Sequence, residues 1–249
     1  MGRLEGKRAI VTGASSGIGA ATVRALQEAG AQVAGGARRR DRVQADVALE
    51  LDVTDPQSCR RFVDDALEAL GGIDVLVNNA GLALGRDPFW KGSDEDEATV
   101  IETNVLGLMR MTRLCVPHMD AGHIVNLGSV AGIWSYANGA SYVASKFAVH
   151  GYTRALRDDL HGRPIRITNI APGLVDTEGF STTRFRGDEQ MARALYADVA
   201  LGGALQAEDV VDCIMFALTR PGHVNIDEIV VLALAQTSGV NVLREQPPA

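Results

Sequence analysis

The sequence is poor in the features that would indicate a disulfide-stabilised, metal-binding or membrane protein. It has only three cysteines in 249 residues, Cys59, Cys115 and Cys213, and none of them forms a CxxC pair. This pattern favours neither a disulfide framework nor a zinc site. No apolar run approaches the roughly 18 residues that span a bilayer, and the N-terminus lacks the apolar stretch of a secretory signal. We therefore expect reduced thiols, no bound metal and a location in the cytoplasm.

Positive charge is also scarce, and this excludes a further group of functions. The chain has 24 Lys and Arg against 31 Asp and Glu, a net charge of −7 at pH 7. Such a surface does not favour nucleic acid or anionic membrane as a partner. Arg38, Arg39, Arg40 and Arg42 form one local basic cluster. The acidic residues 94–97 are typical of a helix start capped by Ser93. We expect a small-molecule substrate as the partner.

What the sequence does contain is the pattern of one α/β domain. It is 46% hydrophobic and 22% charged, as in average soluble proteins, and no linker or repeat divides it. Short runs rich in Val and Ile alternate with segments of helical period, which predicts a single-domain, doubly wound Rossmann fold with a seven-stranded parallel sheet and helices on both faces. The predicted strands are residues 8–12, 32–36, 48–51, 74–78, 123–127, 165–170 and 228–232. The predicted helices are residues 17–29, 56–70, 94–118, 141–161 and 207–219.

Ligands of such sheets bind beyond the carboxyl ends of the strands, and a glycine-rich loop follows the first predicted strand. Residues 12–19 read Thr-Gly-Ala-Ser-Ser-Gly-Ile-Gly. Glycines let the backbone turn sharply and approach a pyrophosphate, which then binds the exposed N–H groups of the helix start. A tight structural turn is the alternative interpretation. The candidate phosphate-binding residues are Gly13, Ser15, Ser16, Gly17, Ile18 and Gly19.

The end of the second predicted strand indicates which dinucleotide binds. A carboxylate there would favour NAD, whereas Arg38 and Arg39 follow a small residue at this point and favour the 2′-phosphate of NADP(H). Arg38 is our first choice for that contact, and a solvated basic turn is the alternative. Asp52 and Val53, which follow the third strand, are candidates for the adenine site, although Asp52 is equally suited to capping a turn.

Three residues provide candidate acid–base chemistry. Tyr142 and Lys146 lie four apart in a predicted helix, so both side chains share one face. The ordinary tyrosine pKa of about 10 is too high for work at neutral pH, and a nearby ammonium is expected to lower it. Ser129 follows the fifth predicted strand, where its hydroxyl can bond a substrate carbonyl.

Further candidates follow other strands at the same edge. Asn79, Ala80 and Gly81 follow the fourth strand, and Pro172-Gly173 follows the sixth, where it can turn the chain over a nicotinamide. Asn104 lies inside the long helix predicted at 94–118. Asparagine has poor helical propensity, so Asn104 is either an ordinary solvent-facing residue, a ligand of a bound water, or the site of a local break in the helix.

Together these residues resemble the short-chain dehydrogenase/reductase family, over about residues 7–242. The likeness implies a catalytic tetrad of Asn104, Ser129, Tyr142 and Lys146. It also implies that Lys146 binds the nicotinamide ribose, that Asn104 holds a water, and that Val175 and Thr177 contribute to the cofactor site. The stretches that carry the likeness are residues 12–19, 78–81, 104, 129, 142–146 and 172–173.

A narrower likeness points to NADP-dependent 3-hydroxy acid dehydrogenases, which act on serine and L-allo-threonine. It implies a homotetramer, or at least a homodimer, with the segments 94–118 and 141–161 between subunits. The chain departs from the family at 41–50, which is shorter than usual, so the helix after the second strand is expected to be truncated or missing. The stretches that carry this likeness are residues 78–85, 128–136, 184–188 and 221–242.

The substrate site is expected at a small lobe of about residues 176–205. Ser129, Leu84, Tyr136 and Arg184 are the candidate substrate contacts, with Arg184 meeting a carboxylate. A surface ion pair of Arg184 with a neighbouring acid at 188 or 189 is the alternative.

Two other functions remain open at this point. A pocket lined by Leu82, Leu84, Trp134 and Tyr136 would suit an NADPH-dependent reductase of a bulkier ketone or aldehyde. A nucleotide-responsive regulator that has lost its chemistry is disfavoured, because the whole tetrad is present.

Overall fold

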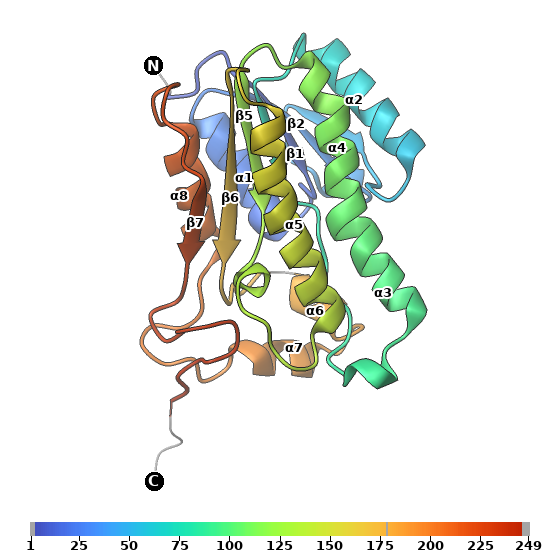
Figure 1. Ribbon diagram of the computed structural model, residues 1–249, viewed down its shortest axis with the longest axis vertical. Coiled ribbons are helices and arrows are strands. Elements are labelled where there is room, and N and C mark those ends of the chain that lie inside the picture. Colours follow the sequence, from blue (N-terminus) through green and yellow to red (C-terminus); the bar gives the residue numbers. More distant parts are fainter. Residues whose placement is uncertain (1–2, 178, 246–249) are drawn as a thin grey trace.

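The computed structural model describes residues 3–177 and 179–245, and it contains one seven-stranded parallel sheet. The strand order is β3-β2-β1-β4-β5-β6-β7, so the chain starts near the middle and winds outward in both directions (Figure 1). The prediction of a doubly wound sheet with seven strands is confirmed. The strands are β1 Arg8–Thr12, β2 Gln32–Ala37, β3 Val47–Glu50, β4 Val75–Asn78, β5 Gly122–Leu127, β6 Ile165–Pro172 and β7 Glu228–Val231.

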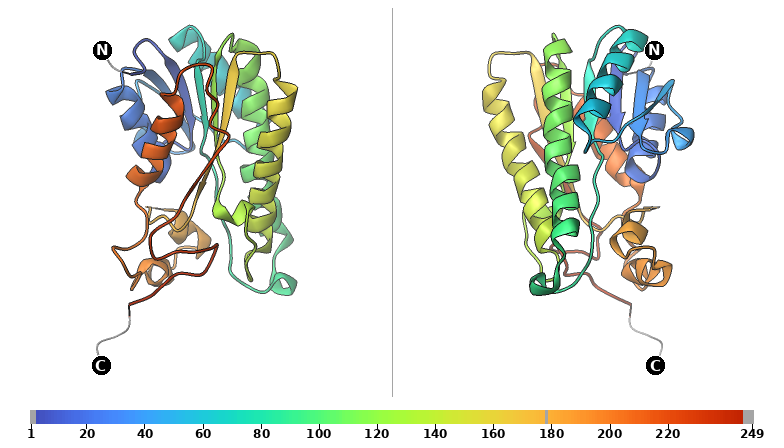
Figure 2. Two further views of the ribbon diagram at one scale, coloured as in Figure 1. Left: turned by 60° about the vertical axis from the view of Figure 1, so that its left-hand side comes forward. Right: turned by 90° about the vertical axis from the view of Figure 1, so that its right-hand side faces the viewer.

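Helices cover both faces of the sheet (Figure 2). Within β1, Ile10 packs into the core under α2, α4 and α5, whereas Val11 packs into the core under α1 and α8. Because both faces are covered, the strands are apolar on both sides, as parallel strands generally are. The helices that flank the sheet are α1 Gly17–Glu28 and α8 Ala207–Leu218 on one face, and α2 Pro56–Leu70, α4 Leu108–Cys115 and α5 Ala140–Asp159 on the other.

Local sequence signals set several helix ends. Helix α2 begins at Pro56, where the side chain of Asp55 accepts a hydrogen bond from the backbone N–H of Gln57 at 2.8 Å. It ends at Leu70, and the following Gly71 has a φ of 75°, in the left-handed region that suits glycine. Ser93 caps α3 (Asp94–Ile101), as predicted.

The prediction of one continuous helix over residues 94–118 is wrong. After α3 the chain forms a π-helical segment, Glu102–Gly107, and only then α4, which is followed by a 3₁₀ turn at Val116–His118. Asn104 lies in the π segment, so its interpretation as a local break is confirmed. Such segments widen the helix by one residue per turn and are frequent at functional sites.

The corner between β2 and β3 is short, as the sequence indicated. A single 3₁₀ turn, Arg40–Arg42, is the only helical structure in that connection. Its Arg40 Nε donates to the carbonyl of Ala48 at 2.9 Å and ties the turn to β3. The side chains of Arg38 and Arg39 are exposed next to it.

Two short helices that the sequence did not predict lie beyond the carboxyl ends of the strands (Figure 1). They are α6 Phe180–Arg184 and α7 Glu189–Tyr196. The C-terminal segment crosses beside them, where Arg244 donates to the carbonyls of Leu195 and Ala197. Of the helices in the described ranges, none is both long and apolar enough to cross a membrane.

Candidate active site

A cleft of about 790 Å³ opens where the strands end and α6 and α7 begin. It brings together residues from every part of the sheet edge. Leu84, Asn104 and Gly19 are not among the described residues that line it. The predicted site residues that line the cleft are Gly13, Ser15, Ser16, Gly17, Ile18, Arg38, Arg39, Asp52, Val53, Asn79, Ala80, Gly81, Ser129, Tyr136, Tyr142, Lys146, Pro172, Gly173, Val175, Thr177 and Arg184.

The glycine loop forms one end of the cleft. Gly13 and Gly17 have φ of +67° and +53°, a region that side chains rarely adopt. A Cβ on Gly19 would lie 2.2 Å from the carbonyl oxygen of Gly13, so Gly19 allows the loop to pack rather than lining the cleft. Among the described residues none caps the start of α1 with a side chain, and its first turn has no acidic residue. The positive end of this helix therefore suits an anion.

Thr12 links the ends of β1 and β4, a role that we did not predict from the sequence. Its Oγ1 accepts the backbone N–H groups of Asn79 and Ala80, each at 3.0 Å. The Asn79 amide in turn donates to the carbonyls of Thr12 at 2.9 Å and Gly13 at 3.2 Å. Asn79 thus fixes the glycine loop as well as lining the cleft.

The corner after β2 carries the arginines that indicated NADP(H). Arg38 and Arg39 both line the cleft, and neither has an ion-pair partner in the part of the chain that the structure describes. Asp52 also lines the cleft, and its Oδ1 accepts the N–H of Thr54 at 2.9 Å and the Thr54 hydroxyl at 2.7 Å. Asp52 therefore caps a turn in addition to facing the cleft.

Helix α5 presents Tyr142 and Lys146 to the cleft from consecutive turns. The Lys146 Nζ lies 5.7 Å from the centroid of the Tyr142 ring and donates to the carbonyl of Leu127 at 2.7 Å. Burial lowers the pKa of Lys146 to about 8. Ser129 lies opposite, where its hydroxyl is hydrogen-bonded to Tyr142.

The expectation that Lys146 would lower the pKa of Tyr142 is wrong for this structure. Burial raises that pKa well above its ordinary value, and the neighbouring Tyr136 raises it further, while the hydrogen bond from Ser129 and the charge of Arg184 oppose the rise. Desolvation of the phenolate outweighs this hydrogen bond and this one cation because the ring is almost wholly buried. The phenol is consequently protonated at neutral pH, as a proton donor must be.

Asn104 lies behind the cleft and orients the loop after β4. Its Oδ1 accepts the N–H of Leu82 and its Nδ2 donates to the Leu82 carbonyl, both at 2.8 Å. Nδ2 also donates to Ser145 at 3.0 Å. The π segment holds Asn104 at a point where its side chain reaches the loop after β4 and forms these bonds. The water-holding role of Asn104 stays a prediction.

Arg184 is buried at the other end of the cleft, with 8% of its surface exposed. Its Nη2 donates to the hydroxyl of Tyr136 at 3.0 Å, and its guanidinium carbon lies 5.7 Å from the ring centroids of both Tyr136 and Tyr142. The alternative surface ion pair is wrong, because Asp188 caps α7 and Glu189 pairs with another arginine. Within the described residues Nε of Arg184 is buried without a hydrogen-bond partner.

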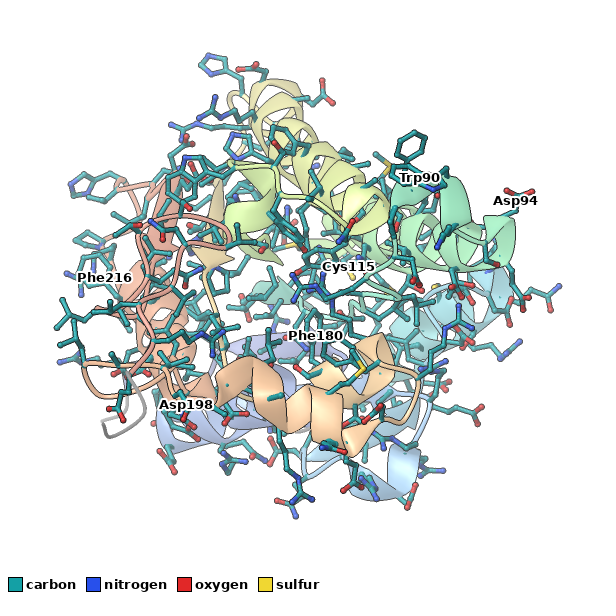
Figure 3. All side chains as sticks on the ribbon, turned by 90° about the horizontal axis from the view of Figure 1, so that it is seen from below. Trp90, Asp94, Cys115, Phe180, Asp198 and Phe216 are labelled. Atoms are coloured by element: carbon teal, nitrogen blue, oxygen red, sulfur yellow. The ribbon has the colours of Figure 1, made fainter. Side chains whose placement is uncertain are left out.

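Sequence reasoning missed several residues at this end, among them Arg86 and Phe180. Arg86 lines the cleft, and Phe180 packs its ring edge-to-face on Tyr142, with centroids 5.9 Å apart. In Figure 3 Phe180 lies near the middle of the view, whereas Trp90 lies at the outer edge. No motif or spacing marks either residue, because the loop after β4 brings Arg86 to the cleft and α6 brings Phe180 to Tyr142. Of the four residues predicted to line an apolar pocket, Leu82 and Tyr136 line the cleft, whereas Leu84 and Trp134 are not among the described lining residues.

Comparisons with known proteins agree with this geometry. A family model described as short chain dehydrogenase matches residues 7–186. The chain belongs to the short-chain dehydrogenase family. The NADP-dependent 3-hydroxy acid dehydrogenase of Escherichia coli strain K12 is 40% identical over 95% of this chain and 99% of its own length. A protein of the same description from Schizosaccharomyces pombe is 39% identical over 99% of this chain and the whole of its own.

Solved structures of this family are also similar. The closed form of a serine dehydrogenase complexed with NADP⁺ has a TM-score of 0.88 and 40% identity, and covers 95% of this chain and 99% of its own. A short chain dehydrogenase from Burkholderia cenocepacia in complex with NADP has a TM-score of 0.79 and 31% identity, and covers 92% of this chain and 97% of its own. The family match ends at residue 186, so it includes Arg184 but leaves α7 and the C-terminal segment outside.

Proposed function

We propose that this short-chain dehydrogenase interconverts a 3-hydroxy acid and its 3-oxo acid, with Tyr142 as the acid and base. The observation that carries this proposal is Arg184, a buried guanidinium without an ion-pair partner among the described residues, 5.7 Å from the ring of Tyr142. A buried, uncompensated cation is costly, and a substrate carboxylate would compensate it with charge-assisted hydrogen bonds.

The reaction class and the cofactor have broader support. The chain is an NADP-dependent oxidoreductase acting on CH–OH donors, as its family and its relatives named for NADP indicate. The residues fit that cofactor: the open start of α1 suits the pyrophosphate, and Arg38 and Arg39 suit the 2′-phosphate. Lys146 would hold the nicotinamide ribose. The bound dinucleotide would supply or accept the hydride.

The protein side of the mechanism follows from the positions of three groups. In reduction, the substrate carbonyl oxygen would accept hydrogen bonds from Ser129 and Tyr142 while Arg184 holds the carboxylate. Tyr142 carries its proton at neutral pH and would transfer it to that oxygen. Lys146 is anchored by the Leu127 carbonyl close to the same ring. In oxidation the phenolate would take the proton back.

A substrate panel tests the proposal. Purified protein would be assayed with NADP⁺ on 3-hydroxypropanoate, L-serine and L-allo-threonine, and on neutral secondary alcohols; NADPH would be assayed with bulky ketones. We expect kcat/KM to be highest for the carboxylates, and the methyl ester of 3-hydroxypropanoate to be a poor substrate. Preference for the ester or for bulky ketones would contradict the carboxylate role and support the ketone reductase instead.

We also propose that the protein forms a homotetramer, or at least a homodimer, through the segments 94–118 and 141–161. Leu106 and Phe147 on these segments are 39% and 46% exposed, and exposed apolar residues favour interfaces. Light scattering after gel filtration would measure the assembly, and a monomer at micromolar concentration would contradict it. The location in the cytoplasm stays a prediction.

A further inference from the structure

The substrate end of the cleft is crowded with cations and poor in acids. Arg86, Lys146, Arg184 and Arg244 line this end. Among the described lining residues Asp52 is the only acid, and it lies at the opposite end, bonded to Thr54. A ligand group in this region therefore meets positive charge, and none of the described residues that line this end carries a carboxylate.

Two of the four cations are already engaged by the backbone. Lys146 donates to the Leu127 carbonyl at 2.7 Å, and Arg244 donates to the carbonyls of Ala197 and Leu195. The other two are different. Arg184 keeps its buried Nε without a partner, and Arg86 makes no hydrogen bond or ion pair within the described chain.

A backbone hydrogen bond joins the two segments that carry these arginines. Gly85 donates its N–H to the carbonyl of Arg184 at 3.1 Å, which joins the loop after β4 to α6. Gly85 has a φ of +66°, so the chain turns there and directs the next residue, Arg86, to the cleft. Burial lowers the pKa of Arg86, and the charge of Arg184 lowers it further, so the two guanidinium groups are within electrostatic reach.

We propose that Arg86 and Arg184 form a two-arginine clamp for the substrate carboxylate, and that this clamp selects 3-hydroxy acids without an ammonium group over β-hydroxy amino acids. Arg184 is fixed by Tyr136, and Arg86 approaches the same anion from the opposite loop. An ammonium on C2, next to the carboxylate, would be repelled by both arginines, and no described lining residue at this end offers it a carboxylate. This inference rests on the proposed function and names the substrate class within it.

A series of substrates that differ only at C2 isolates this effect. 3-Hydroxypropanoate, glycerate and L-serine carry hydrogen, hydroxyl and ammonium at C2, with the same carbinol and carboxylate. We expect kcat/KM with NADP⁺ to be at least about tenfold lower for L-serine than for the other two, or about 1.4 kcal/mol. The deficit of L-serine should shrink as the pH rises and its ammonium loses a proton.

Variants of Arg86 then assign the selectivity. In Arg86→Gln, kcat/KM for 3-hydroxypropanoate should fall about tenfold, mostly through KM, because the side chain holds the carboxylate and not the reacting carbon. In Arg86→Glu, the kcat/KM for 3-hydroxypropanoate divided by that for L-serine should fall further, because the new carboxylate would pair with the ammonium of L-serine. Arg60→Gln, on the exposed face of α2, is the matched control and should change neither value.

The outcomes separate this inference from the function on which it rests. Two results would overturn the clamp without affecting the proposed 3-hydroxy acid activity. One is an equal kcat/KM for L-serine and 3-hydroxypropanoate in the wild type, and the other is an unchanged ratio of these two kcat/KM values in Arg86→Glu. If none of the three acids is oxidised while neutral alcohols are, both the proposed function and the clamp are refuted. Thermal unfolding of each variant shows whether a loss reflects folding instead of binding.

Discussion

The two ends of the cleft are built in different ways. At the dinucleotide end, one continuous loop, residues 13–18, and its helix start form the candidate phosphate site, and residues that follow β2 and β3 add to it. At the substrate end the groups that face the ligand come from the loop after β4, from α5 and from α6, which lie far apart in the sequence. The first end relies on backbone conformation, and the second relies on long side chains.

The electrostatics of the two ends differ in the same way. Arg38 and Arg39 are exposed, so solvent screens their charge until a phosphate binds. Arg184 is buried and its charge acts on the rings of Tyr136 and Tyr142. An identical side chain therefore contributes affinity at one end and substrate selection at the other. Mutations at the two ends should separate cofactor binding from turnover.

Tyr142→Phe, at the junction of the two ends, should have the largest effect. Removal of the hydroxyl eliminates the proton donor but leaves the ring, so we expect kcat to fall about 10³-fold. The Kd for NADPH, measured by fluorescence, should change little. In the wild type, kcat/KM for oxidation should rise with pH, because burial raises the pKa of Tyr142 and oxidation uses the phenolate.

Tyr152→Phe on the same helix is the matched control. Tyr152 lies outside the described cleft lining and its hydroxyl is bonded to Thr112, so its loss should leave kcat and the pH profile unchanged. Near-normal turnover in Tyr142→Phe would mean that another group transfers the proton.

Arg184→Gln should have the next largest effect, and only at the substrate end. Loss of the charge that meets the carboxylate is expected to lower kcat/KM for 3-hydroxypropanoate about 100-fold, or about 2.8 kcal/mol. NADPH affinity should be retained. Arg193→Gln on α7, where the arginine is exposed and pairs with Glu189, should behave as wild type. A parallel loss of NADPH binding in Arg184→Gln would break the distinction between the two ends.

Arg38→Asp should act at the dinucleotide end with a smaller effect. A carboxylate there would repel the 2′-phosphate, so the ratio of kcat/KM for NADPH to that for NADH should fall about 30-fold. The same change at Arg39 should reduce the ratio less. If Arg39→Asp has the larger effect, the phosphate lies nearer to the 3₁₀ turn than the sequence indicated.

The contrast between the ends also explains what could be predicted from the sequence. The glycine loop is contiguous and its spacing reflects backbone geometry, so Gly13 and Gly17 could be placed in advance. The strands could be placed because burial on both faces makes them apolar throughout. The Ser93 cap could be placed because it follows from side-chain chemistry within three residues of the helix start.

The remaining features depend on tertiary contacts. Arg86 and Phe180 have no marking pattern, and α6 and α7 are too short for a helical period to stand out. The pKa of Tyr142 was predicted in the wrong direction because spacing showed the ammonium of Lys146 but not the burial of the phenol. The break at Asn104 could be suspected from propensity, whereas its partner Leu82 could not.

Gly17→Ala should have the smallest effect, at the point where the two ends touch. A methyl group there must adopt a φ of +53° and would lie 3.3 Å from the Cβ of Thr177. We expect a loss of about 1 kcal/mol in the free energy of unfolding and weaker NADPH binding. Gly6→Ala has a similar φ of +71° with nothing within 4 Å, so it should lose the same stability and bind NADPH normally. Weaker binding in both variants would show that stability, and not contact with the loop, limits cofactor affinity.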